Sequence, residues 1–173
     1  TERIDFFHEL SKYKKVDSAG RHLNNIGRSI DDKMDFIKDY KFVISFENST
    51  YPGYTTEKLI EPMLVNSVPV YWGNPVVEKD FNTRSFINIS GKEDYQRAIE
   101  QIIELDKNED QFLEMAAQPW FHNNKIPEEM SEESLIKFFD FVIDDSKTKK
   151  PVGTFWLKNK MHNAELFYNR GLA

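Results

Sequence analysis

The chain contains no cysteine among its 173 residues, which excludes disulfide bonds and metal sites built on thiolates. The same absence favours a reducing compartment. No apolar run approaches the roughly 20 residues that a transmembrane helix needs, and the first residues do not resemble a signal peptide. Because the chain also begins without methionine, we expect it to be a trimmed fragment of a longer protein.

Basic residues are in the minority, since 23 lysines and arginines face 29 aspartates and glutamates, for a formal net charge of −6. Proteins that bind nucleic acids usually carry a basic face, so we expect no nucleic-acid partner. Any phosphate-binding site must therefore be a local pocket of lysine and arginine rather than a broad positive field.

Several motifs of nucleotide and metal chemistry are also missing. The sequence has neither a Gly-x-Gly-x-x-Gly motif nor a P-loop. It has no Asp-x-Asp motif, which disfavours a sugar nucleotide held through a chelated metal. The four histidines are scattered without the spacing of zinc ligands, at His8, His22, His122 and His162. We therefore expect no metal site and no cofactor.

The most informative stretch of the chain runs from Lys41 to Trp72. Apolar runs at 42–46 and 68–72 are typical of strands buried on both faces. Between them, Thr55 or Thr56 is a good N-cap for a helix, and Pro62 predicts that this helix is kinked or short.

A third strand is predicted at 85–89, and three is few for a complete doubly wound domain. Helices alternating with apolar strands predict an α/β fold, a Rossmann-like parallel sheet with helices on both faces. Further helices are predicted at 2–14, 32–39, 93–105, 110–117 and 131–142, with loops at 15–30 and 118–127. We expect residues 1–145 to form one domain and 146–173 to form a linker and a C-terminal tail helix, with a charged linker over 144–153.

Polar residues gather where the first strand ends and the next helix begins, and ligands of open α/β sheets bind at this edge. Lys58 lies in the first helical turn, where a cation opposes the helix dipole unless an anion binds nearby. Glu57 beside it has the chemistry to accept hydrogen bonds from a ribose diol. We therefore interpret the pair as a nucleotide clamp, although an exposed lysine on a helix surface is the simpler reading of Lys58 alone.

Each of the other candidate polar residues allows two interpretations of its role. Glu47 and Asn48 end the strand, but Glu47 is equally compatible with capping a nearby loop. Tyr54 either packs in its loop or presents its hydroxyl and ring to a sugar or phosphate. Arg3 has a guanidinium suited to phosphate, yet its position alone indicates a surface residue.

The aromatic content of 14% supports a different class of protein. A non-catalytic α/β module could bind a glycan or a protein through loop aromatics, with Tyr51, Tyr54, Trp72 and Trp120 as candidates. A third reading makes Glu57 and Lys58 a local ion pair in a chain that merely folds.

The same stretch resembles the donor-binding signature of the alpha-1,3-fucosyltransferases. The resemblance lies in Phe46-Glu47-Asn48, Gly53-Tyr54-Thr55-Thr56-Glu57-Lys58 and Pro69-Val70-Tyr71-Trp72-Gly73. Upstream, Arg3-Ile4-Asp5-Phe6-Phe7, Val16-Asp17-Ser18 and Asn24-Asn25-Ile26-Gly27 are also similar to the family. The similarity covers roughly residues 1–120.

The resemblance implies the C-terminal, donor-binding half of a GT-B glycosyltransferase that uses GDP-fucose and inverts the anomeric carbon without a chelated metal. It implies that Arg3 and Lys58 hold the diphosphate and that Glu57 binds the ribose hydroxyls. Tyr54 and Asn48 would line the donor site, and Glu47 is counted with the donor-binding residues.

The family places its catalytic base in an N-terminal, acceptor-side domain, so no catalytic residue is assigned in this chain. We expect the fragment to be inactive alone, with GDP-fucose, a glycan acceptor and the missing N-terminal domain as its partners. The acceptor would be an N-acetylglucosamine or glucose hydroxyl, as in lipopolysaccharide or other glycan synthesis. We expect a cytoplasmic protein, peripheral at the inner membrane if bacterial, or a Golgi lumen protein if eukaryotic.

Overall fold

The computed structural model describes residues 1–148. The chain divides into two compact units, Thr1–Lys125 and the part that begins at Ile126. The tail helix predicted near the C-terminus lies outside the described residues, and the domain boundary predicted after residue 145 stays a prediction. No helix within residues 1–148 is long and apolar enough to cross a bilayer.

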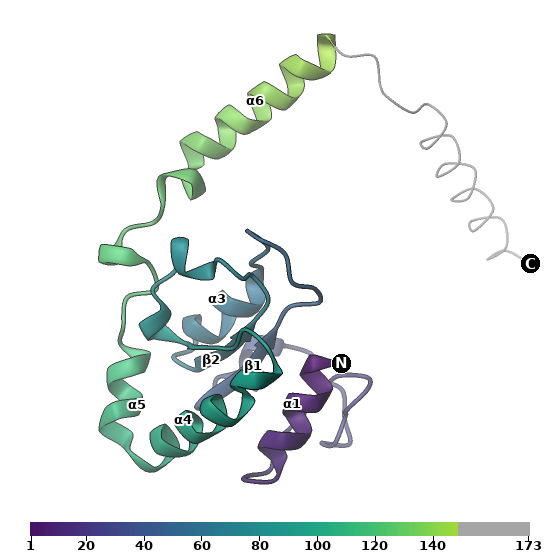
Figure 1. Ribbon diagram of the computed structural model, residues 1–173. Coiled ribbons are helices and arrows are strands. Elements are labelled where there is room, and N and C mark those ends of the chain that lie inside the picture. Colours follow the sequence, from purple (N-terminus) through teal and green to yellow (C-terminus); the bar gives the residue numbers. More distant parts are fainter. Residues whose placement is uncertain (149–173) are drawn as a thin grey trace, which may run out of the picture. The chain divides into compact units, whose positions relative to one another are not determined.

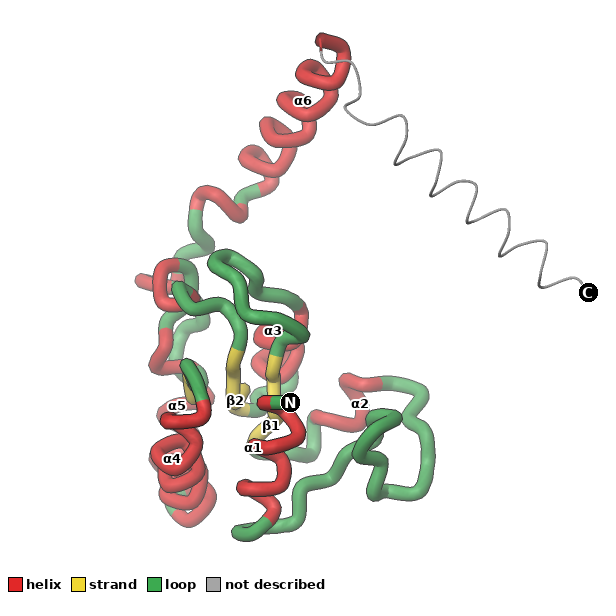
Figure 2. Tube along the Cα trace, turned by 45° about the vertical axis from the view of Figure 1, so that its right-hand side comes forward, coloured by secondary structure: helices red, strands yellow, loops and turns green. Residues whose placement is uncertain are grey.

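The first unit is built on a parallel sheet of three strands, in the order β1-β2-β3. The strands are β1 (Phe42–Phe46), β2 (Val68–Trp72) and β3 (Ile87–Asn88). The first two are in register from end to end, with Phe42 opposite Val68 and Phe46 opposite Trp72. Figure 2 shows β1 and β2 side by side, with loops following both strands at the same edge.

Helices cover both faces of this sheet, as the sequence predicts, because alternate side chains of β2 point to opposite sides. Val68 and Val70 pack in a cluster with residues of α1 (Glu2–Ser11), α4 (Tyr95–Lys107) and α5 (Glu109–Ala116). Tyr71 packs in a second cluster with Leu59 and Met63 of α3 (Glu57–Leu64). Figure 1 shows these elements and their labels.

Helix α3 begins where the sequence predicts, with Thr56 as its N-cap. It has only eight residues and ends before Asn66, whose φ of 61° is left-handed. The buried Pro62 fits because the helix is short, so the structure agrees with the second of the two alternatives for this proline.

Several predicted ends differ from the structure. Strand β3 is shorter than predicted because the Asn82 side chain accepts a hydrogen bond from the Arg84 backbone N–H and starts a 3₁₀ turn there. Helix α2 (Lys33–Ile37) is likewise shorter than predicted. The 3₁₀ turns are Val77–Lys79, Thr83–Ser85, Lys92–Asp94, His122–Asn124 and Glu128–Met130.

Strand β1 has a partner on one side among the described strands. The Lys41 carbonyl and the Glu47 N–H bond to β2. Backbone groups alternate along a strand, so those of Phe42, Ile44 and Phe46 point to the open side. A cavity of ≈ 890 Å³ lies along this strand, and Arg3 and Lys58 are among the residues that line it.

The second unit contains α6 (Glu132–Thr148), which extends past the helix end predicted at residue 142. Many of its apolar side chains are exposed, including Leu135, Ile136, Phe138, Phe139, Phe141 and Val142. Among the described residues, every member of the two hydrophobic clusters lies before Lys125.

Candidate functional site

Glu47 follows β1 directly, and its side chain is 0% exposed. Its Oε1 accepts a hydrogen bond from the Thr56 N–H at 2.8 Å, and its Oε2 accepts one from the Thr56 hydroxyl at 2.8 Å. The same Oε2 lies 3.4 Å from the Lys58 Nζ. These contacts match the loop-capping alternative, because Glu47 ties the end of β1 to the start of α3.

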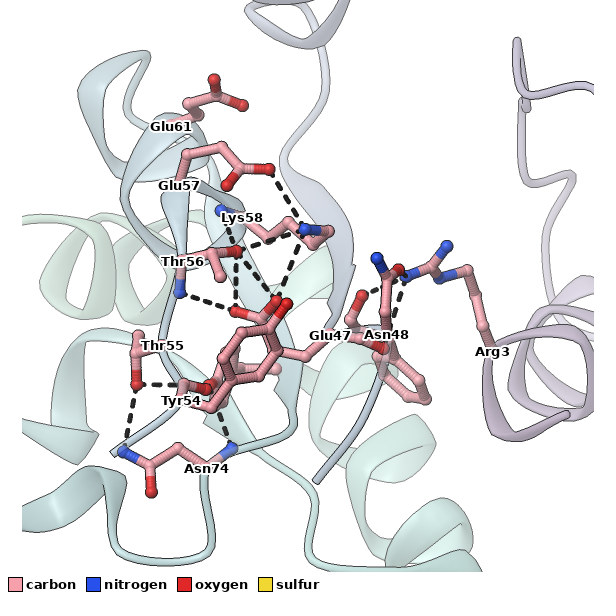
Figure 3. Close-up of polar contacts among 12 residues, drawn as sticks. Arg3, Glu47, Asn48, Tyr54, Thr55, Thr56, Glu57, Lys58, Glu61 and Asn74 are labelled. Atoms are coloured by element: carbon pink, nitrogen blue, oxygen red, sulfur yellow. Dashed lines mark hydrogen bonds and ion pairs between the residues drawn. The ribbon is translucent and has the colours of Figure 1, made fainter. Parts of the chain in front are cut away.

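Lys58 lies at the centre of a small charged network (Figure 3). Its Nζ lies 3.1 Å from Glu57 Oε1 and 3.2 Å from Thr56 Oγ1, in addition to its contact with Glu47. The Thr56 hydroxyl donates to Glu47 and accepts from both the backbone N–H and the ammonium of Lys58. One donor and two acceptor positions are all that a hydroxyl offers, so Thr56 is fully used.

The pKa values of this pair keep both charges in place at neutral pH. Burial alone would lower the pKa of Lys58, but the Glu57 and Glu47 carboxylates outweigh it and the pKa is raised. The hydrogen bond from Lys58 lowers the pKa of Glu57, with burial opposing. The Glu57 side chain is 55% exposed against 22% for Lys58, so Glu57 is the partner that solvent or a ligand reaches more easily.

Arg3 reaches the same edge of the sheet from α1. Its guanidinium donates to the Phe46 carbonyl, to the Glu47 carbonyl at 3.5 Å and to Asn48 Oδ1 at 3.4 Å. Figure 3 shows Arg3 and Asn48 meeting beside the Glu47 backbone. Arg3 is exposed, as its sequence position indicates, and its guanidinium nevertheless contacts the backbone at the end of β1.

The Asn74 side chain holds the loop between β1 and α3 in place through hydrogen bonds. The sequence analysis did not identify Asn74 as a site residue. Its Oδ1 accepts from the N–H groups of Gly53 and Val76 at 2.9 and 3.0 Å, and its Nδ2 donates to Thr55 Oγ1 at 3.1 Å. The Tyr71 hydroxyl accepts from the Asn74 N–H, and burial raises the pKa of Tyr71. The only signal was Asn74 in a Gly-Asn-Pro turn, where asparagine often binds nearby backbone.

Tyr54 lies in this fastened loop and is 37% exposed. Its N–H donates to the Tyr51 carbonyl at 3.0 Å, and its own carbonyl accepts from the Tyr71 hydroxyl at 3.4 Å. The Tyr54 backbone is thus held while much of its side chain faces solvent.

Five of the six predicted site residues are linked by these contacts: Arg3, Glu47, Asn48, Glu57 and Lys58. Two cations and the positive end of an eight-residue helix lie at this edge, where the Glu47 and Glu57 carboxylates oppose them. The described residues contain no group of three or more side chains suited to a metal ion. This arrangement is typical of α/β domains that bind phosphate-bearing ligands at the carboxyl ends of parallel strands.

Comparison with known proteins identifies the family to which this α/β domain belongs. Residues 1–142 match the family described as "Glycosyltransferase family 10 (fucosyltransferase) C-term". The chain therefore belongs to glycosyltransferase family 10, and the predicted family is confirmed.

The relatives agree with this assignment. The chain is 30% identical over 152 residues to the alpha-(1,3)-fucosyltransferase FucT of Helicobacter pylori, which covers 83% of this chain and 31% of that protein. It is 34% identical over 145 residues to the putative fucosyltransferase R654 of Acanthamoeba polyphaga mimivirus, covering 77% of this chain and 24% of that protein.

A solved structure supports the fold. A crystal structure of an alpha1,3-fucosyltransferase with GDP-fucose superposes with a TM-score of 0.75 and 30% identity, over 83% of this chain and 44% of the other. The Rossmann-like half of a GT-B fold is thus confirmed. The chain spans less than half the length of the relatives it matches.

Proposed function

We propose that this chain is the GDP-fucose-binding domain of an inverting alpha-1,3-fucosyltransferase. The observation that carries the proposal is the pair of Lys58 and Glu57 at the start of α3, in a chain that superposes on a fucosyltransferase crystallised with GDP-fucose. In the proposed enzyme, L-fucose passes from GDP to an N-acetylglucosamine or glucose hydroxyl of a glycan.

Lys58 and Arg3 hold the diphosphate beside the positive end of the α3 dipole. As the bond between fucose and GDP breaks, negative charge grows on the departing diphosphate. Cations already fixed beside it stabilise that charge without rearranging in the transition state. This role fits two cations held by several hydrogen bonds each.

Glu57 binds the ribose hydroxyls, and Tyr54 and Asn48 line the donor site. In the structure the Glu57 carboxylate is paired with Lys58. Binding of GDP therefore exchanges partners: the diphosphate takes the place of Glu57 at Lys58, and Glu57 turns to the ribose.

The proposed reaction also needs a base to deprotonate the acceptor hydroxyl. We assign this base and most of the acceptor cleft to an N-terminal domain of the same enzyme. The chain alone then binds the donor but does not transfer fucose. Measurable transfer from GDP-fucose to N-acetyllactosamine by this chain alone would contradict that assignment.

Isothermal titration calorimetry with GDP tests the donor site. Removing one charge-assisted phosphate contact costs about 1.5–3 kcal/mol, so Lys58→Ala is expected to weaken GDP binding by about 10- to 150-fold. Lys92→Ala is the matched control, because Lys92 pairs with Asp5 at an exposed position outside the network around Lys58.

Two results would contradict the proposal: no GDP binding by the wild-type chain, or GDP binding that Lys58→Ala leaves unchanged. A wild-type chain that bound oligosaccharides but no nucleotide would instead favour the non-catalytic module. One observation supports that alternative, since Tyr51 in the loop before α3 is 69% exposed.

A further inference from the structure

We propose that Glu47 is a positioning residue for the diphosphate site: it holds the Lys58 ammonium in place and does not itself touch the nucleotide. The inference rests on the proposed function and deepens it. Glu47 then acts on the donor indirectly, through Thr56 and Lys58, and does not bind the donor itself.

The burial of Glu47 is the first argument. Its side chain is 0% exposed, and its two oxygens are occupied by the Thr56 N–H, the Thr56 hydroxyl and the Lys58 ammonium. A buried carboxylate without partners is strongly unfavourable, so these contacts fix the position of α3's first turn relative to β1. No free face of the carboxylate remains for a ribose or a phosphate.

The backbone opposite Glu47 provides the second argument. Gly73 follows β2, and a Cβ atom at this position would lie 2.4 Å from Glu47 Cγ and 2.7 Å from Glu47 Cβ. The close approach of the two strand ends therefore depends on a residue without a side chain. The chain makes room for the Glu47 side chain at the place where Lys58 is held.

The third argument is that the two carboxylates at Lys58 differ in exposure, since Glu47 is buried and Glu57 is exposed. A lysine ammonium sits on a flexible four-carbon stem and loses entropy when it is ordered. Glu47 and Thr56 hold it from the buried side at 3.4 and 3.2 Å, and the exposed Glu57 holds it at 3.1 Å. An incoming diphosphate can displace Glu57 while Glu47 keeps the ammonium ordered.

The substitution Glu47→Gln tests this role because it keeps the shape and removes the charge. If Glu47 acted only through the electrostatic repulsion between its negative charge and the diphosphate, removing that charge would tighten GDP binding. If Glu47 positions Lys58, GDP binding weakens despite the gained positive potential. We expect a loss of about 5- to 20-fold for GDP and no more than about 2-fold for guanosine, which lacks the phosphates.

A double-mutant cycle then identifies Lys58 as the group through which Glu47 acts. In a Lys58→Ala background, Glu47→Gln is expected to change the Kd for GDP by no more than about 2-fold. A merely structural role predicts equal losses for GDP and guanosine in both backgrounds. The Kd values for both ligands are measured by titration calorimetry on the full chain.

The matched control is Asp94→Asn, which also turns a carboxylate held by a backbone N–H and a basic side chain into an amide. Asp94 accepts from the Ser90 N–H at 2.8 Å and lies 3.3 Å from the Arg97 guanidinium, and it does not line the cavity that Arg3 and Lys58 share. This variant is expected to leave GDP binding unchanged. Should Glu47→Gln fail to fold, Glu47→Asp replaces it, since the shorter carboxylate keeps its charge but withdraws from Lys58.

The outcomes separate the two proposals. No GDP binding by the wild type overturns the proposed function and this inference together. Normal wild-type binding that Lys58→Ala weakens, but that Glu47→Gln leaves equal or tighter, overturns the positioning role alone. Equal losses for GDP and guanosine also overturn it, whereas a loss confined to GDP that disappears without Lys58 supports it.

Discussion

At the scale of single residues, Gly73 is a position where a small change should have a large effect. A Cβ atom there would overlap Glu47 Cγ at 2.4 Å, and the φ of +157° is one that side chains rarely adopt. Since Glu47 is buried and bonded on both oxygens, it cannot move aside. We expect Gly73→Ala to lower the free energy of unfolding by about 1–3 kcal/mol, as measured by urea denaturation.

Gly20→Ala is the control for this prediction. Its added Cβ would meet its nearest neighbour, Ser18 Oγ, at an ordinary 3.8 Å. We expect this change to leave the unfolding free energy within about 0.5 kcal/mol of the wild type. Equal stability of the two variants would show that Glu47 has room to yield.

The individual residues also show how far a sequence can be interpreted. Lys58 and Glu57 were found because strand, loop and helix signals placed them at a known binding edge. Arg3 was placed by resemblance, because its contacts lie 43 to 45 residues away along the chain. The role of Asn74 was invisible, since its partners are backbone groups that only folding brings together.

At the scale of elements, the loop between β1 and α3 depends on one side chain. Asn74 is 3% exposed, and its side chain makes three hydrogen bonds across the loop and its own turn. Asn74→Ala leaves the Gly53 N–H without its partner, which costs about 1–3 kcal/mol where a donor stays buried. We expect lower stability and faster amide hydrogen exchange at 49–56, together with weaker GDP binding.

Asn82→Ala separates stability from loop order. Asn82 is also buried, and it donates to the Pro119 carbonyl and accepts from the Arg84 N–H. We expect it to destabilise the chain as Asn74→Ala does, but to leave exchange at 49–56 unchanged. If both variants raised exchange there equally, the loop would be responding to global stability and Asn74 would have no special role.

The helices and strands were largely predictable from the spacing of apolar residues and from helix-capping residues. Strands 42–46 and 68–72 were predicted at their observed ends, because each is an apolar run bounded by polar residues. The start of β3 was not, since a side-chain hydrogen bond from the Arg84 N–H to Asn82 forms a 3₁₀ turn that includes Ser85, where the strand was predicted to begin. Such local competition leaves no mark in the pattern of apolar residues.

At the scale of the molecule, the donor site should survive loss of the second unit. Both hydrophobic clusters and all six predicted site residues lie within Thr1–Lys125. A chain ending at Lys125 is therefore expected to stay folded, with a circular dichroism spectrum that loses only the contribution of the removed residues, and to bind GDP within about 2-fold of the full chain.

The same truncation should reduce the fluorescence of a dye that binds exposed apolar surface. Helix α6 carries several large apolar side chains that are about half exposed, and exposed apolar surface binds such dyes. An unfolded product, or the loss of GDP affinity, would show that the first unit needs the residues after Lys125.

The class of fold was predicted from the order of strands and helices, because parallel strands need crossovers and the connecting helix supplies one. The division after Lys125 was not predicted. The apolar stripe of α6 resembles that of a core helix, and a stripe does not reveal which surface, if any, covers it.

The unit from β1 through α3 to β2 spans only residues 42–72, yet it contains Glu47, Thr56 and Lys58 with all their mutual contacts. Contacts between residues close in sequence form early in folding because their loops are cheap to close. The lysine side of the site would therefore assemble first, and the arginine would arrive later, when α1 docks. A nucleotide present during refolding would therefore meet a site in which Lys58 is already in place but Arg3 is not.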